Sequence, residues 1–237
     1  MARAASKRTK GDPATARALA SEALEAKGRR LSPDERERHI VRAAVAFFAE
    51  HGFDGQTREL AKAMGATQPL IYRYFPTKEA LIERVYQEVF VGHFKPSWEG
   101  LIEDETLPVR QRLTAFYQDY AGIILSYEWV RLFMFSGLRG LDFNTRYLGT
   151  LRERIFPRVI DQLRRAYGRP RVADHPPTQT EIETIWGLHA AIYYLGVRQH
   201  IYHLPVPADL NAVIAGKIDG LFDGVEAMLH PATPGSR

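Results

Sequence analysis

The chain has 237 residues, 45% of them hydrophobic and 25% charged, which is enough apolar material for a packed core. It contains no cysteine, so disulfides, thiolate metal sites and cysteine nucleophiles are excluded within it. No apolar run is long enough to span a membrane, and the first residues lack the apolar stretch of a secretory signal, so we expect a cytoplasmic protein.

The net charge of +4 is concentrated near the N-terminus. Residues 1–31 carry eight Lys or Arg side chains against three acidic ones, and the remaining chain is close to neutral. A basic arm on a neutral body favours a polyanionic partner whose phosphate contacts weaken with salt. The alternative interpretation is a solvated tail without a partner. We therefore expect residues 1–31 to form a flexible basic arm.

Ordered structure is predicted to begin at Ser32. Residues 32–35 (SPDE) form a capping box, with proline at the first helical position. The apolar residues that follow recur at helical spacing, at Ile40, Val41, Ala44, Phe47 and Phe48. Gly52 is expected to close the helix in a left-handed conformation, with Phe53 folded back on Phe48. This pattern predicts a helix over 33–51.

Two short helices are predicted next, over 58–64 and 68–74, with Thr57 and Thr67 as their N-cap residues. Gly65 ends the first of them and supplies the positive φ of the connecting turn. Two short helices joined by a tight turn form a helix-turn-helix unit.

The remainder of the chain is also predicted to be helical. The expected helices run from Thr77 to about His93 and then over 107–127, 128–140, 144–167, 178–203 and 207–229. No segment alternates apolar and polar residues long enough to indicate a strand. We therefore predict an all-α fold of about nine helices plus an N-terminal arm. Its expected divisions are the arm 1–31, a helix-turn-helix domain 32–78, a larger helical domain 79–230 and a flexible tail 231–237.

The helix over 68–74 presents a polar face. Gln68 and Tyr72 are four residues apart and lie together, and a glutamine amide near the helix start suits adenine. Pro69 offers a flat apolar surface to a thymine methyl group. The residues placed to contact phosphate are Tyr72, Arg73 and Tyr74, together with Thr57, Thr67 and Lys78 near helix N-termini. The alternative is that the aromatic residues are partly buried and the charges simply solvated.

Residues 38–86 resemble the DNA-binding domain of the TetR (tetracycline-repressor-like) family. The resemblance rests on FFAEHGFDGQT and on RELAKAMGATQPLIYRYFPTKEALIERVY. Its most specific part is the tail formed by Tyr72, Tyr74, Phe75, Lys78 and Leu81. Beyond about residue 95 only the helical layout is similar to the family.

The resemblance implies a nine-helix subunit in which the first three helices bind DNA and the fourth links them to a ligand-sensing domain. It implies that the last two helices pair across a two-fold axis in a homodimer. The implied DNA contacts are Thr57, Thr67, Gln68, Pro69, Tyr72, Arg73, Tyr74 and Lys78. Two features depart from the family pattern: Pro69 stands where many members carry a small residue, and the arm is longer than usual.

Aromatic residues are abundant in the middle of the chain. The family pattern implies an apolar ligand pocket lined by some of Tyr117, Tyr120, Phe133, Phe135, Trp186, His189 and Tyr193. The alternative is an ordinary packed core. His200 and His203 have metal-ligand spacing, but no third ligand is evident, so we expect neither a metal nor a cofactor.

The helices over 178–203 and 207–229 are the predicted dimer elements. One face of the first carries Ile182, Ile185, Trp186, His189, Ile192, Tyr193 and Gly196. One face of the second carries Leu210, Val213, Ile214, Lys217, Leu221, Val225 and Met228. The alternative is that these faces pack inside one subunit. Four glycines, Gly196, Gly216, Gly220 and Gly224, are candidates for close helix approach.

The sequence therefore predicts a transcriptional regulator, of the type that represses and is released by ligand. Its expected partners are double-stranded, pseudo-palindromic operator DNA, a largely apolar small-molecule effector and a second copy of the chain. No catalytic motif is present, so an enzyme is not expected. The alternative is an architectural DNA-binding protein that needs no ligand.

Overall fold

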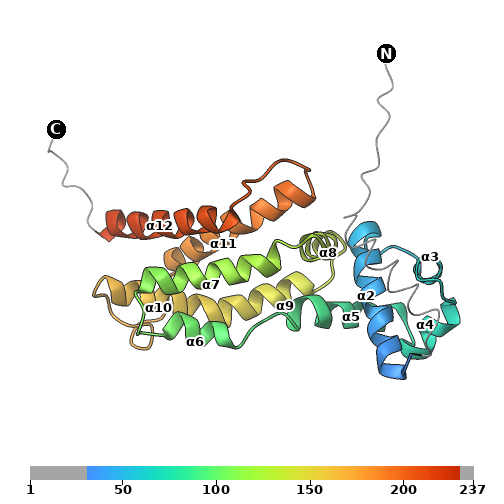
Figure 1. Ribbon diagram of the computed structural model, residues 1–237. Helices are drawn as coiled ribbons and strands as arrows, with labels where there is room; N and C mark the ends of the chain where they lie inside the picture. The colour runs from blue at the N-terminus through green and yellow to red at the C-terminus, as the bar shows by residue number, and fades with distance from the viewer. Residues whose placement is uncertain (1–30, 230–237) are drawn as a thin grey trace, which may run out of the picture.

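The computed structural model describes residues 31–229, and the side chains of residues 31–224 among them (Figure 1). These residues form α-helices and two π-helical segments without any strand, which confirms the predicted all-α fold. The first helices are α2 Pro33–His51, α3 Thr57–Ala63, α4 Gln68–Tyr74 and α5 Lys78–Tyr86, which continues as the π-helical segment Gln87–Val91. They are followed by α6 Ser97–Glu103, α7 Val109–Ile124, α8 Tyr127–Leu138 and α9 Phe143–Thr150, which the π-helical segment Leu151–Ile155 joins to α10 Phe156–Ala166. The last two are α11 Gln179–His200 and α12 Leu210–Leu229.

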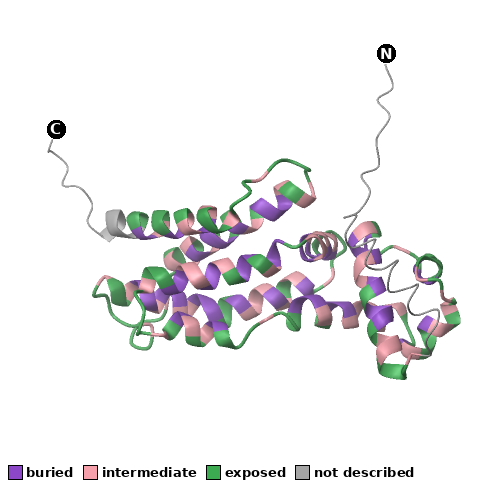
Figure 2. Ribbon diagram, viewed as in Figure 1, coloured by how far each residue is buried: buried purple, intermediate pink, exposed green. Residues whose placement is uncertain are grey.

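The helices form two groups. Figure 1 shows α2, α3 and α4 packed together at one end and an elongated bundle of α6, α7 and α9 to α12 reached through α5, with α8 seen end-on next to α2. Buried residues lie on the facing sides of the bundle helices, whereas the outer side of α12 is exposed (Figure 2). Within the described residues, none of the helices combines the length and apolar character needed to cross a bilayer.

Helix α2 forms for the reasons that the sequence indicated. The Ser32 hydroxyl accepts from the Glu35 amide at 3.2 Å, and the Glu35 carboxylate accepts from the Ser32 amide at 2.8 Å, which confirms the capping box. Gly52 closes the helix at φ 72°, and the rings of Phe48 and Phe53 lie 5.5 Å apart. A Cβ atom at Gly52 would also lie 3.2 Å from the Phe135 ring. Both the positive φ and the lack of space therefore favour glycine at this position.

The predicted helix ends differ from the observed ones by up to about three residues. One helix, α6, was not predicted, because Pro96 was interpreted as a break only. Tertiary contacts stabilise this short helix: Trp98 and Ile102 are buried, and the Trp98 indole donates to the Asp119 carboxylate at 2.7 Å. A seven-residue helix of this kind depends on packing rather than on its own propensity.

The predicted helix over 144–167 is present, but it contains the π-helical segment Leu151–Ile155 between α9 and α10. Pro157 lies in the first turn of α10 and has no N–H to donate to the preceding turn. A local widening of the helix just before a proline accommodates that missing hydrogen bond.

The two groups of helices are joined mainly through α8. Its Arg131 donates to the backbone carbonyls of Ala49 and Glu50 at the end of α2, and the second of these bonds measures 3.2 Å. Its Tyr127 hydroxyl donates to the Glu50 carboxylate at 2.6 Å. A helix end leaves its last carbonyls without partners, and here α8 supplies them.

A second connection joins α9 to α5. Arg146 forms two parallel hydrogen bonds of 2.8 Å with the Glu83 carboxylate. Its guanidinium also lies 3.9 Å above the Tyr86 ring. The paired guanidinium holds the pKa of Glu83 below its usual range, so this carboxylate remains ionised and bonded at neutral pH.

Helix α11 begins with a second capping box, formed by Thr178 and Glu181. Arg164 of α10 adds two hydrogen bonds of 2.7 Å to the same carboxylate and a third, of 2.6 Å, to the carbonyl of His175. The bonds from Arg164 and Thr178 lower the pKa of Glu181 to about 2.

The first testable prediction concerns the close approach of α11 to α8. A side chain at Gly196 would lie 2.7 Å from Val130 and 3.1 Å from Leu125, so Gly196→Ala should lower the free energy of unfolding by about 1–3 kcal/mol. Gly122→Ala in α7 meets nothing within 4 Å and should instead stabilise by roughly 0.5–1 kcal/mol through helix propensity. Urea unfolding followed by circular dichroism measures both. Equal effects of the two variants would contradict this packing of α11 on α8.

The second prediction concerns acid stability. Because the pKa of Glu181 in the folded protein is depressed to about 2 from its ordinary value of 4.5, the stabilising contribution of this carboxylate is complete above about pH 5 and is lost as pH falls toward 2. Glu181→Gln retains the capping shape without the charge. Its difference from wild type in unfolding free energy should therefore be largest at pH 6–7 and shrink below about pH 4. A difference that stays constant over this range would rule out a charge contribution.

Candidate nucleic-acid interface and interior site

The helix-turn-helix is built as α3, a turn containing Gly65 at φ 63°, and α4. The amide of Ala66 donates to the carbonyl of Ala61 at 2.9 Å, which holds the turn closed. Leu60 and Ala61 of α3 and Ile71 of α4 are buried and keep the two helices together. Ile71 is the only buried residue within α4, so the rest of this helix is available at the surface.

Thr57 plays a role that differs from its predicted one. It was expected to cap α3, but the N-cap residue is Gln56, and Thr57 is the first residue inside the helix, only 5% exposed. Its hydroxyl lies 3.1 Å from the Tyr72 hydroxyl and accepts from the Gln68 amide nitrogen at 2.9 Å. The buried Thr57 hydroxyl therefore orients the side chains of Gln68 and Tyr72 on α4.

This bonding leaves Gln68 able to read a base. Its amide nitrogen carries two hydrogens, and Thr57 takes one of them. The second hydrogen and the amide oxygen remain, which are the two groups that a glutamine uses on the major-groove edge of adenine. Tyr72, at 38% exposure, stands beside it with its hydroxyl held in place.

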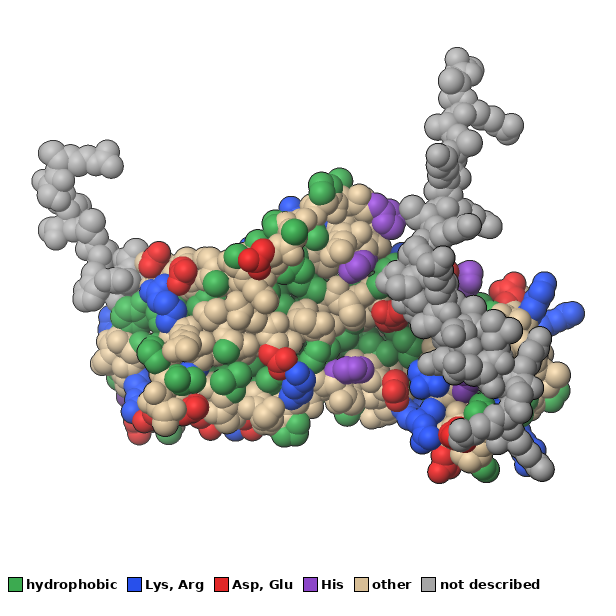
Figure 3. Space-filling view, viewed as in Figure 1, with side chains coloured by type: hydrophobic (Ala, Val, Ile, Leu, Met, Phe, Trp, Pro, Cys, Tyr) green, Lys and Arg blue, Asp and Glu red, His purple; other side chains and the backbone are tan. Residues whose placement is uncertain are grey.

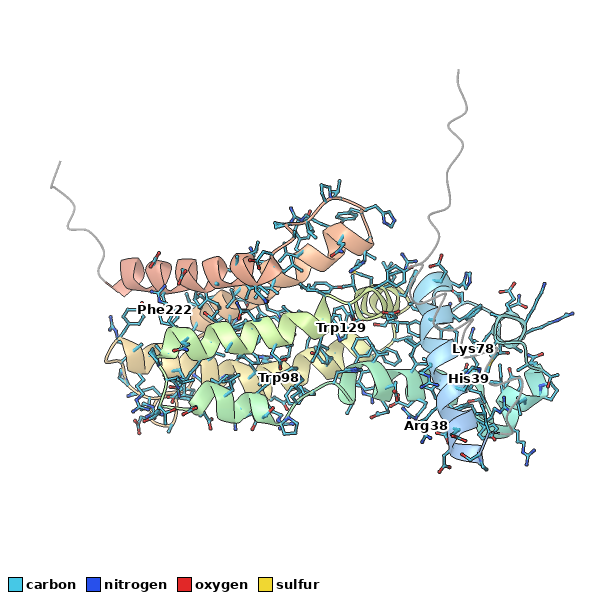
Figure 4. The ribbon with its side chains drawn as sticks, viewed as in Figure 1. Arg38, His39, Lys78, Trp98, Trp129 and Phe222 are labelled. Atoms are coloured by element: carbon cyan, nitrogen blue, oxygen red, sulfur yellow. The ribbon has the colours of Figure 1, made fainter. Side chains whose placement is uncertain are left out.

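The other predicted contact residues surround this pair. Thr67, Pro69 and Arg73 are exposed, and Tyr74 and Lys78 are half-buried. Thr67 is the N-cap residue of α4 as predicted, although its side chain makes no capping hydrogen bond. Lys78 begins α5 and lies beside the α2–α4 group in Figure 4.

The structure adds basic residues that sequence reasoning did not include. Arg58 and Lys62 are exposed on α3, and Arg38 is exposed on α2. Lys and Arg side chains project from this end of the molecule in Figure 3. The four-residue spacing of Arg58 and Lys62 was visible in the sequence. It did not stand out, because residues 32–79 contain as many acidic as basic side chains.

Most of the residues predicted to line a pocket lie together inside the bundle. Tyr120 is 6.4 Å from Tyr117 and 5.7 Å from His189 between ring centroids, and Trp186 lies 5.7 Å from His189. Phe133 and Tyr193 are 5.5 Å apart. Together they form an aromatic cluster among α7, α8 and α11.

Two further aromatic residues belong to this cluster although they were not predicted for it. The Trp129 ring lies 5.7 Å from Tyr193 and 5.2 Å from Tyr147. Phe135 lies elsewhere, because it faces Gly52 and stacks under Arg131 near the end of α2. Residues 133 and 135 are two apart on a helix and so point to different sides.

The interior of the cluster is polar as well as aromatic. The Tyr120 hydroxyl lies 3.2 Å from the His189 ring nitrogen Nδ1. Burial lowers the pKa of His189 to about 4, so the imidazole is neutral at neutral pH. Burial also raises the pKa of Tyr117, Tyr120 and Tyr193, so their hydroxyls keep their protons.

The two histidines with metal-ligand spacing, His200 and His203, have different surroundings. The His200 ring nitrogen Nε2 lies 2.9 Å from the carbonyl oxygen of Leu125, whereas His203 is exposed in the following loop at φ 55°. No cluster of three candidate metal ligands occurs among residues 31–229.

The apolar faces predicted for dimerisation are largely used inside the subunit. Ile185, His189, Ile192 and Gly196 of α11 are buried, as is Ile214 of α12. Gly196 makes its close approach to α8 of the same chain, whereas a Cβ atom at Gly216, Gly220 or Gly224 would meet nothing within 4 Å. The side chains of Val225 and Met228 lie outside the described residues.

The opposite faces of these two helices are exposed and consist mainly of small residues. On α11 they are Gly187, Ala190, Ala191 and Tyr194, and on α12 they are Ala212, Gly216 and Gly220. Tyr194 is 51% exposed and pairs with Tyr202, 54% exposed, at a ring distance of 6.4 Å.

Comparison with known proteins places these features in a family. The family model of bacterial regulatory proteins of the tetR family matches residues 40–85. The tetracycline repressor of class A from transposon 1721 of Escherichia coli is 32% identical over 92 residues, which are 35% of this chain and 42% of the repressor. The class D tetracycline repressor of Escherichia coli is 29% identical over 94 residues, 36% of this chain and 43% of that protein. The chain thus spans less than half the length of these curated relatives.

The fold similarity extends further than the sequence similarity. The structure of a transcriptional regulator from Pseudomonas aeruginosa PAO1 superposes with a TM-score of 0.62 at 20% identity, covering 87% of this chain and 99% of the other. At this identity the likeness concerns the fold, and it covers the bundle as well as the helix-turn-helix. The helix-turn-helix region of the chain, residues 40–85, therefore belongs to the TetR family of bacterial regulatory proteins.

Proposed function

We propose that this protein is a repressor that binds double-stranded operator DNA through α3 and α4 and releases it when a small molecule binds inside the bundle. The observation that carries the DNA-binding part is the hydrogen-bonded arrangement of Thr57, Gln68 and Tyr72 on an exposed helix. Two side chains of α4 are held in place before any DNA arrives, which reduces the entropy lost on binding. The match of residues 40–85 to the tetR family model supports the same assignment.

In this proposal α4 enters the major groove. Gln68 reads an adenine with its amide, and Pro69 contacts a thymine methyl group. Thr67, Tyr72, Tyr74, Arg73 and Lys78 contact the phosphate backbone, with Arg58 and Lys62 of α3 beside them. Thr57, being buried, positions Gln68 and Tyr72 rather than touching DNA.

Binding to a pseudo-palindromic operator requires two copies of the chain, with their α4 helices about 34 Å apart. We propose that the exposed small-residue faces of α11 and α12 form the homodimer interface. Gly187, Ala190 and Gly216 would allow two helix pairs to approach closely, and Tyr194 would contribute buried aromatic area. This places the interface on the sides opposite to those that the sequence pattern favoured.

Release by an effector requires a mechanical link between the bundle interior and α4. Helix α8 supplies one, because Trp129 and Phe133 contribute to the aromatic cluster while Tyr127 and Arg131 of the same helix bind the end of α2. Helix α5 supplies a second, because Phe90 at its extension lies 5.2 Å from Trp129. An effector that binds better to one arrangement of α8 and α5 would shift α2 to α4 and change the operator spacing.

The third prediction tests sequence-specific binding. The probe is the DNA immediately upstream of the gene for this protein, titrated by fluorescence anisotropy at physiological salt with excess random competitor. Gln68→Ala should weaken binding by about 5- to 150-fold, equivalent to roughly 1–3 kcal/mol, because one base contact is lost. Gln199→Ala, an exposed glutamine on α11, should change binding less than about twofold.

The outcomes separate the competing functions. Competitor-resistant binding that depends on Gln68 supports the regulator. Binding that random DNA displaces equally well would support an architectural DNA-binding protein, which is the alternative function. No binding even at low salt would exclude the helix-turn-helix as a DNA site.

The fourth prediction separates positioning from contact. Thr57→Val removes only the buried hydroxyl and should weaken specific binding by about tenfold, because Gln68 and Tyr72 lose their shared partner. Thr57→Ser keeps a hydroxyl at this position and should retain most of the wild-type affinity for the specific probe. The salt dependence should be unchanged in both variants, since no charge is removed, whereas Arg73→Ala should reduce the salt slope by about 1. A changed salt slope in Thr57→Val would indicate that Thr57 contacts phosphate itself.

A further inference from the structure

The interior of the bundle contains polar groups that the fold does not use. The hydroxyls of Tyr117 and Tyr193 and the indole N–H of Trp129 are buried without a hydrogen-bond partner in the described part of the chain. Tyr117 is 2% exposed and Trp129 is 1% exposed. A buried polar group without a partner destabilises the protein by its desolvation, so native proteins rarely keep several together.

These groups converge on one region. The Trp129 and Tyr193 rings lie 5.7 Å apart, and the Tyr117 and Tyr120 rings lie 6.4 Å apart. The Tyr120 hydroxyl is influenced electrostatically by the hydroxyls of Tyr147, Tyr117 and Tyr193, which raise its pKa beyond the effect of burial. Hydroxyls from α7, α9 and α11 therefore approach one another in the middle of the aromatic cluster.

The same region lacks a charge. Burial alone accounts for the shifted pKa values of Tyr117, His189 and Tyr193, with no contribution from a charged side chain of the described residues. Arg112, the buried cation of α7, donates instead to the carbonyl of Ile102 at 2.7 Å and to Gln162 at 3.0 Å. A ligand that carries a full charge would lose its hydration here without gaining an opposite charge.

We propose that the effector is an uncharged, ring-containing molecule with hydrogen-bond acceptor atoms, such as ring carbonyls, that meet Tyr117, Tyr193 and Trp129. The surrounding aromatic faces of Phe133 and Tyr147 would contact its ring. An indole N–H can only donate, so at least one ligand atom must accept. This inference rests on the proposed function, and it replaces the expectation of a largely apolar effector by one of defined polarity.

The test compares three probes with the same ring skeleton by isothermal titration calorimetry on the full-length protein. 1,4-Naphthoquinone has two carbonyl acceptors, naphthalene has none, and 1-naphthoate is an anion. Because the chain has no cysteine, the quinone meets no thiol to react with. We expect naphthoquinone to bind at least about tenfold more tightly than either of the others, from one or two additional hydrogen bonds. Equal affinities, preference for naphthoate, or no binding of naphthoquinone would overturn the proposal.

Variants that remove single hydroxyls locate the site. Tyr117→Phe and Tyr193→Phe should each weaken naphthoquinone binding by about five- to tenfold and leave naphthalene binding within about twofold. Tyr202→Phe, which alters an exposed tyrosine outside the cluster, should leave both unchanged. Unaltered naphthoquinone affinity in both cluster variants would show that the probe binds elsewhere and would overturn the assignment of these hydroxyls.

Melting temperatures of the free variants provide an independent measurement. If the hydroxyls have no internal partner, Tyr117→Phe and Tyr193→Phe should melt at the wild-type temperature or above it, because replacement of an unpaired buried hydroxyl by hydrogen is neutral or stabilising. A clear fall in melting temperature for both would show that the hydroxyls are satisfied within the free protein, for example by bound water, and would overturn the proposal.

The operator-DNA titration distinguishes failure of this inference from failure of the proposed function. Operator binding without any preference for naphthoquinone would leave the regulator intact and remove the ligand class. Preference for naphthoquinone in a protein that binds no DNA would retain the interior site and remove the repressor.

Discussion

The position of the DNA-binding helices depends on how the end of α2 is held by α8. Arg131 donates to the carbonyls of Ala49 and Glu50, and Tyr127 donates to the Glu50 side chain. Burial and the bond to Glu50 raise the pKa of Tyr127 to about 12, so the donor is retained at neutral pH. Gly52, at a positive φ directly beside the Phe135 ring, adds a further contact between the end of α2 and α8. Helix α8 thereby holds the end of α2 and helps to orient the helix-turn-helix.

This arrangement supports the proposed link between the bundle interior and the helix-turn-helix. Helix α8 has one side in the aromatic cluster and another at α2, and a packed helix moves as a unit because interiors are close-packed. The contact between Arg146 and Glu83 ties α9 to α5 in parallel, although it is partly exposed and contributes modestly on its own. In the proposed function, these two connections, one from α8 to α2 and one from α9 to α5, would carry a change in the interior to α4.

The polar groups on α4 and those inside the bundle differ in whether they have hydrogen-bond partners. On α4, Gln68 and Tyr72 share the Thr57 hydroxyl and keep further hydrogen-bonding capacity toward solvent. Inside the bundle, Tyr120 has His189 as a partner, while the nearby Tyr117 and Tyr193 hydroxyls have none within the described residues. The first arrangement fits readout of a surface ligand such as DNA, and the second fits a ligand that enters the interior.

The sequence by itself determined the local structure of this protein, because helix starts, helix ends and tight turns depend on residues within a few positions of one another. The capping box at Ser32 and the turn at Gly65 illustrate this, as does the set of residues that α4 exposes. Only the tertiary structure decided that Thr57 lies beneath α4, that Phe135 meets Gly52 rather than the aromatic cluster, and that α6 forms at all. It also decided which faces of α11 and α12 are buried within the subunit. These features depend on contacts between residues far apart in the chain. An apolar stripe along a helix indicates that one face is buried, but it does not indicate which element covers that face.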